Sequence, residues 1–401
     1  MTKIYLIRHA EAEGNLYRMA HGHYNGMITN YRGYQQIDAL RQRFQDVDID
    51  AVYASDLYRT QITSRAIWLP KALPLHLEPA FREIHMGVWE NHTWHELNKA
   101  YPQEMYHFNR RVDLWHVEDG ETAQDVLDRY LPALHRVGAA HDGGTVAVFS
   151  HGAALRIVLG TLQGVPLSGI GETPHGDNTA VSLLTWDNGQ LRVEYRDDNS
   201  HLTERGLSTF AKQSWWRSKN MVDPGEDYLP LPEELLPRFH VPDGGEAVGI
   251  RSGETFIGAY QLLPDREPDA VWLGWYWLDP AFRGTGRGIA PMGQIIRAGR
   301  HRGVGFLRLS SCQLIFLILP HRKVIWLLGF QCIKHQVYGV LELLVILPDF
   351  HGVDELDKSG KVLFFHRGFI VDISDEGAVQ KRFRLDPEII SSLAFSLGIR
   401  Y

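Results

Sequence analysis

The chain opens with a short apolar segment that ends at two polar side chains. Residues Ile4 to Ile7 form a continuous apolar run, and Arg8 and His9 follow it directly. A run of this length predicts a buried strand, and the small and polar residues after it favour a loop and the start of a helix. Ligands of open α/β sheets bind at the carboxyl ends of the strands. The pattern therefore places a cation and an imidazole where a ligand would lie.

Two later segments also combine an apolar run with a helix start. Residues 50–54 predict a short strand, after which Ser55 is expected to cap a helix that carries Arg59 in its first turn. Residues 144–149 predict another buried strand, followed by His151 and by small residues that open a helix. Both helix starts favour an anion, because the positive end of the helix dipole lies there.

A histidine beside an arginine suits phosphoryl transfer. A neutral imidazole can attack phosphorus, and the planar guanidinium group can neutralise the phosphoryl oxygens. Taken alone, however, an Arg-His pair after a strand is common, and an arginine in the first turn of a helix is usually solvated. His21 and His23 lie in a polar loop, where they line a pocket, bind a metal ion or remain solvated. The order of several motifs must therefore decide the function.

Composition limits the class of protein. The 401 residues are long for one domain and predict two, with 44% hydrophobic residues to form the cores. A formal net charge of -7 gives no overall attraction for nucleic acid. Cys312 and Cys332 are too few for a disulfide framework, and the amino terminus has no signal-peptide pattern. No apolar run has the length of a membrane-spanning helix. We therefore expect a cytoplasmic protein without a membrane or nucleic-acid partner.

The first apolar segment belongs to a motif that resembles the signature of the histidine phosphatase superfamily, also called the phosphoglycerate mutase-like family. The motif covers residues 6–11, with Asn15 after it. Later motifs of that family are resembled, in the expected order, by residues 55–60, 81–91, 119–122, 148–152 and 194–202. Asn91 stands where the family has glycine, and Thr122 replaces a serine at a helix cap. The resemblance covers residues 1–202 and implies a three-layer α/β/α domain.

The resemblance implies a role for each catalytic side chain. His9 attacks the phosphoryl group, and Arg8, Arg59 and His151 stabilise the charge on its oxygens. Glu83 gives a proton to the departing alkoxide and later takes one from water.

The expected substrate is a small phosphorylated molecule. The resemblance implies that Asn15 and Asn178 contact it, and that no metal ion is needed, because two guanidinium groups and a histidine supply the positive field. Glu90 competes with Glu83 for the acid role, but it resembles a structural position of the family. The alternative activity is that of a phosphoglycerate mutase, in which the same pocket serves a phosphorylated acceptor. The stretch between Glu83 and His151 is short for the lid of the mutases, which favours hydrolysis.

The sequence changes character after residue 202. Residues 203–242 contain several prolines and predict a linker. A second domain is expected over residues 243–347, where strand-like runs precede a glycine-rich turn and a helix. This turn resembles the acetyl-CoA loop of the GNAT acetyltransferases; the alternative is a plain strand-to-helix connection. The cofactor-binding residues that the resemblance implies are Arg283, Gly284, Gly286, Arg287 and Gly288.

The second half of this resemblance departs from the family. Ile325 stands where the family has a tyrosine that protonates the leaving thiolate, and residues 314–319 are apolar where a polar loop is expected. The resemblance therefore implies an α+β GNAT-like fold and acetyl-CoA binding, with an amine acceptor if transfer occurs. Residues 348–401 match no known pattern and form an unassigned extension.

Three functional hypotheses follow. The leading one is a metal-independent phosphomonoester hydrolase with a phosphohistidine intermediate, fused to a GNAT-like acyl-CoA-binding or N-acetyltransferase module. The second is an acetyltransferase whose N-terminal domain senses a phosphorylated ligand, and Ile325 argues against it. The third is a non-catalytic scaffold, which would require defects among the pocket residues that the sequence does not show.

Overall fold

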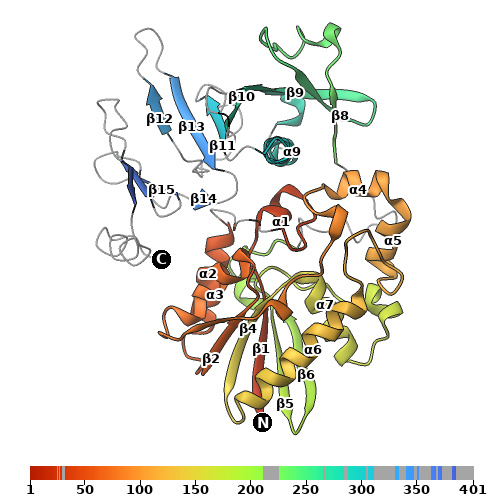
Figure 1. Cartoon of the computed structure of the whole chain (residues 1–401), viewed down its shortest axis with the longest axis vertical. Helices are drawn as coiled ribbons and strands as arrows, with labels where there is room; N and C mark the ends of the chain where they lie inside the picture. Colours follow the sequence, from red (N-terminus) through yellow and green to blue (C-terminus); the bar gives the residue numbers. More distant parts are fainter. Residues whose placement is uncertain are drawn as a thin grey trace. The chain divides into compact units, whose positions relative to one another are not determined.

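A computed structural model describes residues 1–24, 26, 28, 32–210, 225–264, 268, 270–283, 288–303 and 306–310, and six strands beyond them. The chain divides into two compact units, Met1–Pro224 and Gly225–Tyr401. In Figure 1 the first unit runs from red to yellow-green, and the second runs from green to blue.

The first unit is built on a six-stranded sheet with the order β3-β2-β4-β1-β5-β6. Its strands are β1 (Thr2–Arg8), β2 (Ala51–Ala54), β3 (Leu75–Leu77), β4 (Thr145–Ser150), β5 (Val181–Asp187) and β6 (Gln190–Asp198). The strands β3, β2, β4 and β1 run parallel, whereas β5 is antiparallel to β1 and forms a hairpin with β6. The carboxyl ends of β1, β2 and β4 therefore meet at one edge of the sheet.

Helices connect these strands. They are α1 (Glu13–Tyr17), α2 (Arg32–Arg43), α3 (Tyr58–Trp68), α4 (Trp94–Ala100), α5 (Pro102–Arg110), α6 (Ala123–Ala140), α7 (Gly152–Leu162) and α8 (Ser200–Thr203). The described residues of this unit also form the 3-10 turns η1 (Pro79–Phe81), η2 (Gly87–Trp89) and η3 (Leu167–Glu172). Helix α3 contacts β2 and β4 and packs on α2, whereas α6 and α7 contact β1 and each other.

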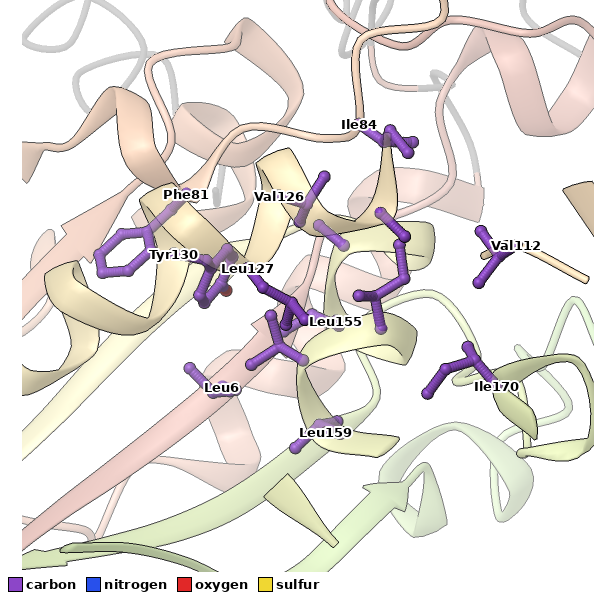
Figure 2. Close-up of a cluster of buried hydrophobic side chains, with 14 of the residues drawn as sticks. Leu6, Phe81, Ile84, Val112, Val126, Leu127, Tyr130, Leu155, Leu159 and Ile170 are labelled. Carbon is purple, nitrogen blue, oxygen red and sulfur yellow. The ribbon is translucent and has the colours of Figure 1, made fainter. Parts of the chain in front are cut away.

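Alternation along the strands produces two cores. Ile4 and Leu6 of β1 belong to a cluster with residues of α6 and α7, whereas Ile7 belongs to a cluster with residues of α2 and α3. Figure 2 shows Leu6 with Leu155 and Leu159 of α7 in the first of these cores. Successive side chains of a strand point to opposite faces, so the two pairs of helices cover opposite faces of the sheet. The predicted three-layer α/β/α fold is confirmed.

Capping agrees with the sequence at one helix and differs at another. Thr122 caps α6, because its hydroxyl accepts a hydrogen bond from the N–H of Asp125. Ser55 does not cap α3, which begins at Tyr58 after the N-cap residue Leu57. The Ser55 hydroxyl instead accepts from the N–H of Leu57 and contacts a buried histidine ring. The prediction was wrong here because this hydroxyl has a tertiary partner.

The second unit contains a seven-stranded sheet with the order β12-β13-β11-β10-β9-β8-β7. Its elements are β7 (Asp227–Pro230), η5 (Glu233–Leu235), β8 (Ala247–Ser252), β9 (Thr255–Pro264), β10 (Ala270–Leu278), η6 (Pro280–Phe282), α9 (Ile289–His301), β11 (Phe306–Ser310), β12 (Phe330–Ile333) and β13 (Val340–Ile346). Strands β7 to β10 form an antiparallel meander, and β10 pairs parallel with β11 across the connection that contains α9. This mixed sheet with a crossover helix is the α+β fold expected for the domain.

The structure adds strands to two regions that the sequence left open. Strand β7 lies within residues 203–242, the predicted linker, and is the edge strand beside β8. Pro230 is compatible with this place, because an edge strand does not need every backbone N–H. A separate four-stranded sheet lies within the unassigned extension and consists of β14 (Phe350–His351), β15 (Leu363–His366), β16 (Phe369–Asp372) and β17 (Arg382–Arg384). Ile325 and residues 314–319 lie outside the described residues.

Candidate active site

The first unit holds a cavity of about 200 Å³ where β1 ends. Five of the side chains predicted for catalysis or substrate binding line it: Arg8, His9, Asn15, Arg59 and Glu83. They come from the end of β1, from α1, from α3 and from the loop after η1, so the fold joins distant parts of the sequence. Two further predicted residues, His151 and Asn178, are fully buried behind these side chains.

His9 is fixed by its backbone and by its ring. The N–H of His9 donates to the carbonyl of Ser150 at 3.0 Å, which ties the end of β1 to β4. The ring is 5% exposed, and its Nδ1 lies 2.7 Å from the carbonyl oxygen of Ala10. A carbonyl can only accept, so Nδ1 carries the proton and the lone pair is on Nε2. Burial and the charges of Arg59 and Arg8 hold the pKa of His9 well below its ordinary value, which keeps the ring neutral.

Arg8 presents an unused donor beside this ring. Its Nη1 donates to the carbonyl of Gly176 at 2.7 Å, whereas its buried Nε has no partner among the described residues. A Cβ on Gly152 would lie 3.1 Å from this Nε, so the glycine lets the start of α7 approach the guanidinium group. A buried N–H without an acceptor is costly and suits a ligand oxygen.

Arg59 is a buried cation with three fixed contacts. The side chain is 2% exposed, and its Nη1 and Nη2 donate to the carbonyls of Tyr24 and Gly22 at 2.9 and 2.7 Å. Its Nε donates to Nδ1 of His151 at 3.1 Å. Burial lowers the pKa of Arg59 to about 10, so the group remains charged at neutral pH.

His151 is held as the opposite tautomer from His9. Its Nδ1 accepts from Arg59, so the proton is on Nε2, which donates to the hydroxyl of Ser55 at 2.9 Å. The centres of the His9 and His151 rings are 5.3 Å apart. The sequence analysis identified His151 but not its contact with Ser55, because Ser55 was interpreted as a helix cap.

Glu83 lies against the start of α7. Its Oε1 accepts from the N–H groups of Ile84 and Ala154 at 3.0 and 2.7 Å, and its Oε2 accepts from the N–H of Ala153 at 3.1 Å. The positive end of the helix dipole favours a carboxylate at this place. Glu83 is therefore fixed in the wall of the cavity that also contains His9.

The backbone of Glu83 is held by Arg129, a residue that sequence reasoning missed. Arg129 of α6 donates to the carbonyl of Glu83 at 2.8 Å and to the carbonyls of Ala80 and Arg82 at 2.7 and 2.9 Å. Its Nε also bonds to Glu121 at 2.7 Å. No motif marks Arg129, because its acceptors include backbone carbonyls that every residue carries.

Asn15 and Asn178 form a linked pair, but only Asn15 lines the cavity. The side-chain amide of Asn178 donates to the carbonyl of His9 and to Oδ1 of Asn15, both at 3.1 Å. Asn178 is 0% exposed. Its placement differs from the expectation of substrate contact and suits the positioning of His9 and Asn15.

Glu90, the competitor of Glu83, does not line the cavity. Its Oε1 accepts from the N–H groups of His23 and Met86 at 2.6 and 3.2 Å. Burial raises the pKa of Glu90. His23 bonds through Nε2 to the carbonyl of Glu83 at 2.8 Å, so this loop histidine supports the wall of the site.

The predicted acetyl-CoA loop is described in part. Arg283 donates from Nε to the carbonyl of Leu278 at 2.7 Å, and its guanidinium carbon lies 4.4 Å from the ring centre of Trp277. Gly288 directly precedes α9. The remaining predicted residues, Gly284, Gly286 and Arg287, lie outside the described residues.

The described residues contain neither a candidate metal-binding cluster nor a candidate membrane-spanning helix. No group of three or more His, Cys, Asp or Glu side chains is arranged to hold a metal ion there. Within the same residues, no helix has the length and apolar character needed to cross a membrane.

Comparison with known proteins identifies two families. Residues 4–199 match the histidine phosphatase superfamily (branch 1), and residues 210–314 match the acetyltransferase (GNAT) family. Phosphoserine phosphatase 1 of Hydrogenobacter thermophilus is 33% identical over 174 residues, which are 42% of this chain and 79% of that protein. A probable phosphoglycerate mutase, GpmB of Erwinia tasmaniensis, is 29% identical over 166 residues, 41% of this chain and 77% of that protein.

Among solved structures, Bacillus stearothermophilus YhfR matches with 29% identity and a TM-score of 0.49, and the match covers 50% of this chain and all of that one. The chain belongs to the histidine phosphatase superfamily and is a phosphatase-family enzyme fused to an acetyltransferase-like module.

Proposed function

We propose that the N-terminal domain hydrolyses small phosphomonoesters through a phosphohistidine on His9, with no metal ion. The observation that carries the proposal is the 2.7 Å contact between Nδ1 of His9 and the carbonyl oxygen of Ala10. Because Nδ1 is bonded to the carbonyl of Ala10, the lone pair is on Nε2, beside the cavity that Arg8 and Arg59 also line. Transfer of a phosphoryl group to histidine requires a neutral ring with a free lone pair, and nearby cationic donors stabilise the charge on the phosphoryl oxygens.

In the first step, Nε2 of His9 forms a bond to phosphorus while the P–O bond to the leaving alcohol breaks. Arg8 and Arg59 stabilise the charge on the phosphoryl oxygens. Glu83, which a dianionic substrate beside it brings into its protonated form, gives its proton to the departing oxygen, so that a neutral alcohol leaves. The two guanidinium groups supply the positive charge that a metal ion supplies in other phosphoryl-transfer enzymes.

In the second step, water attacks the phosphohistidine. Glu83 takes a proton from the water as the new P–O bond forms, and the electron pair of the N–P bond returns to Nε2 of His9. Inorganic phosphate then leaves, and both side chains return to their initial protonation states. In this mechanism Asn178 and His151 are positioning residues, because they hold the carbonyl of His9 and the guanidinium of Arg59.

A mutase activity would share the first step and differ in the second, because the phosphoryl group would pass to a hydroxyl of the substrate. Relatives named as a phosphatase and as a probable mutase both match this chain. We favour hydrolysis because the segment between Glu83 and His151 contains two short helices, α4 and α5, before the core helix α6.

The test measures phosphate release from 4-nitrophenyl phosphate by the full chain in the presence of EDTA. A parallel reaction with ³²P-labelled substrate is quenched to trap acid-labile protein phosphate. We expect turnover and trapped phosphate in the wild type, and a loss of turnover by at least about 10³-fold in His9→Ala. The matched control is His76→Ala, an exposed histidine on β3, which should behave like the wild type. Equal turnover in wild type and His9→Ala would contradict the proposal.

For the second unit we propose acetyl-CoA binding at the turn between β10 and α9. The start of a helix offers N–H groups to a pyrophosphate, and Gly288 stands directly before α9. Calorimetry of the full chain with acetyl-CoA tests this. A Cβ on Gly288 would lie 3.6 Å from the hydroxyl of Tyr276, an ordinary contact, so Gly288→Ala is a suitable control for Gly288→Asp. We expect the added carboxylate to weaken binding at least about tenfold relative to the alanine variant; equal affinities would refute the site.

A further inference from the structure

Beyond the proposed catalytic residues, the cavity of the first unit has an apolar wall. The side chains that form it are Ile84, Met86, Trp94, Phe108, Val112 and Ile170. Figure 2 shows Ile84, Val112 and Ile170 on three separate segments at one end of the core cluster. The rings of Trp94 and Phe108 are stacked, with their centres 5.6 Å apart. This wall favours a leaving alcohol with an apolar body.

The same cavity offers no counter-ion for a cationic leaving group. Among the described residues, Glu83 is the only acidic side chain that lines it. The oxygens of Glu83 already accept three backbone N–H bonds, and the proposed mechanism uses this carboxyl group as the acid. An ammonium group buried without an anionic partner is unfavourable.

Arg156 of α7 brings a buried positive charge to the cavity. The side chain is 7% exposed, and its Nη2 donates to the carbonyls of Gly171 and Thr173 at 2.6 and 3.0 Å. Its Nε donates to the carbonyl of Thr173 at 3.2 Å and to its hydroxyl at 3.3 Å. Its Nη1 bonds to none of the described residues, and no carboxylate there lies within ion-pair distance of it. A buried guanidinium without an anion favours an anionic ligand.

The position of Arg156 suits the far end of a short leaving group. Gly152, at the start of α7, packs against the guanidinium of Arg8. Arg156 follows four residues later on the same face of the helix, about 6 Å further along its axis. Burial and the charges of Arg196 and Arg110 lower the pKa of Arg156 to about 10, so it stays charged at neutral pH.

A second cavity adjoins the first, because Asn109, Arg156 and His175 line both. Its acidic side chain, Glu172, forms an ion pair with Arg110 at 3.2 Å and is 77% exposed. The carboxylate of Glu172 is therefore engaged by Arg110.

We propose that the preferred substrate is the phosphate ester of an alcohol with a compact apolar body that ends in a carboxylate, and that Arg156 binds this carboxylate. This inference rests on the proposed phosphatase activity. It adds a substrate class, because the phosphoryl group, the apolar body and the carboxylate each have a separate part of the cavity.

The test compares three substrates whose leaving groups differ in the charge at the far end: benzyl phosphate, 4-carboxybenzyl phosphate and 4-(aminomethyl)benzyl phosphate. With the wild-type full chain, kcat/KM for the carboxylate should exceed that for benzyl phosphate by about 10- to 100-fold. The ammonium substrate should be the poorest. Equal kcat/KM values would overturn the carboxylate subsite and leave the phosphatase proposal standing, whereas no turnover of any substrate would overturn both.

Two variants address Arg156 separately. Arg156→Met should abolish the preference for the carboxylate over the ammonium substrate. Asn109→Asp should reduce the same preference, because it adds a negative charge at nearly constant size to the wall that both cavities share. The matched control is Arg136→Met, a 62% exposed arginine of α6 outside the cavity, which should keep the wild-type ratio. A ratio that stays at the wild-type value in both test variants would overturn the assignment to Arg156.

Discussion

The Nε–H of Arg59 donates to Nδ1 of His151 across 3.1 Å, and the two side chains are 2% and 0% exposed. A guanidinium group cannot accept a hydrogen bond, so this contact fixes the proton of His151 on Nε2. Burial and the charge of Arg59 hold the pKa of His151 well below its ordinary value. The site therefore combines a fixed cation with a neutral imidazole and avoids two adjacent positive charges.

We expect Arg59→Lys to lower kcat/KM for an aryl phosphate by about 10²- to 10³-fold. A single ammonium group cannot replace the fork that bonds at once to His151 and to the carbonyls of Gly22 and Tyr24. Steady-state kinetics measures the loss. Arg65→Lys, an exposed change on the same helix, should retain the wild-type rate. Matching kinetics for the two variants would contradict a role for Arg59.

The histidines of the site should be neutral tautomers of opposite type. The contacts predict Nδ1–H for His9 and Nε2–H for His151. Burial and the charge of Arg59 lower both pKa values, so the neutral rings should persist as the pH falls below about 6.5. Nitrogen NMR of ¹⁵N-histidine-labelled protein reports both tautomers, and the variants His9→Gln and His151→Gln assign the signals. An Nε2–H tautomer for His9 or an Nδ1–H tautomer for His151 would contradict the predicted contacts, and titration of either ring near 6.5 would contradict the lowered pKa values.

Glu83→Gln should slow the hydrolysis of an alkyl phosphate by about 10²- to 10⁴-fold. The effect on kcat/KM for 4-nitrophenyl phosphate should be much smaller, because kcat/KM reports formation of the phosphohistidine and nitrophenolate leaves without a proton. Glu90→Gln is the matched control, since Glu90 is half-buried nearby but does not line the cavity. It should change both substrates by the same factor. The ratio of the two kcat/KM values is the measurement, and a leaving-group dependence in Glu90→Gln would assign the acid role to Glu90 instead.

The residues that follow strands were predictable from local pattern. Arg8, His9 and His151 each stand at the end of an apolar run, and parallel strands bring such ends to one edge. The alternation of Ile4, Leu6 and Ile7 between two cores likewise follows from the period of a strand. For these features, the direction of the strands and the two-residue period of their side chains determine where the residues lie.

The supporting contacts were not predictable in the same way. Arg129 holds the backbone of Glu83 through carbonyl groups, which have no sequence signature. Asn178 was expected to touch substrate, yet its place behind His9 depends on loops whose paths no periodicity specifies. In the second unit, prolines suggested a linker over a segment that contains strand β7. This strand ends at Pro230, which is compatible with an edge strand because such a strand tolerates the missing N–H.

Acid should destabilise the first unit, and His201 should contribute to the loss. Nδ1 of His201 accepts from Arg43 at 3.2 Å, and Nε2 donates to the hydroxyl of Thr179 at 3.0 Å. Burial and the charge of Arg43 lower the pKa of His201 to about 4 in the folded chain, from about 6.5 when unfolded. Between these values the unfolded state binds a proton that the folded state does not. The free energy of unfolding therefore decreases as the pH is lowered, by up to about 1.4 kcal/mol per pH unit. Urea unfolding at several pH values gives the free energy of unfolding as a function of pH. Its slope should be shallower for His201→Gln than for the wild type, whereas the exposed change Gln190→Asn should keep the wild-type slope. Parallel slopes for His201→Gln and the wild type would show that His201 is protonated equally in both states.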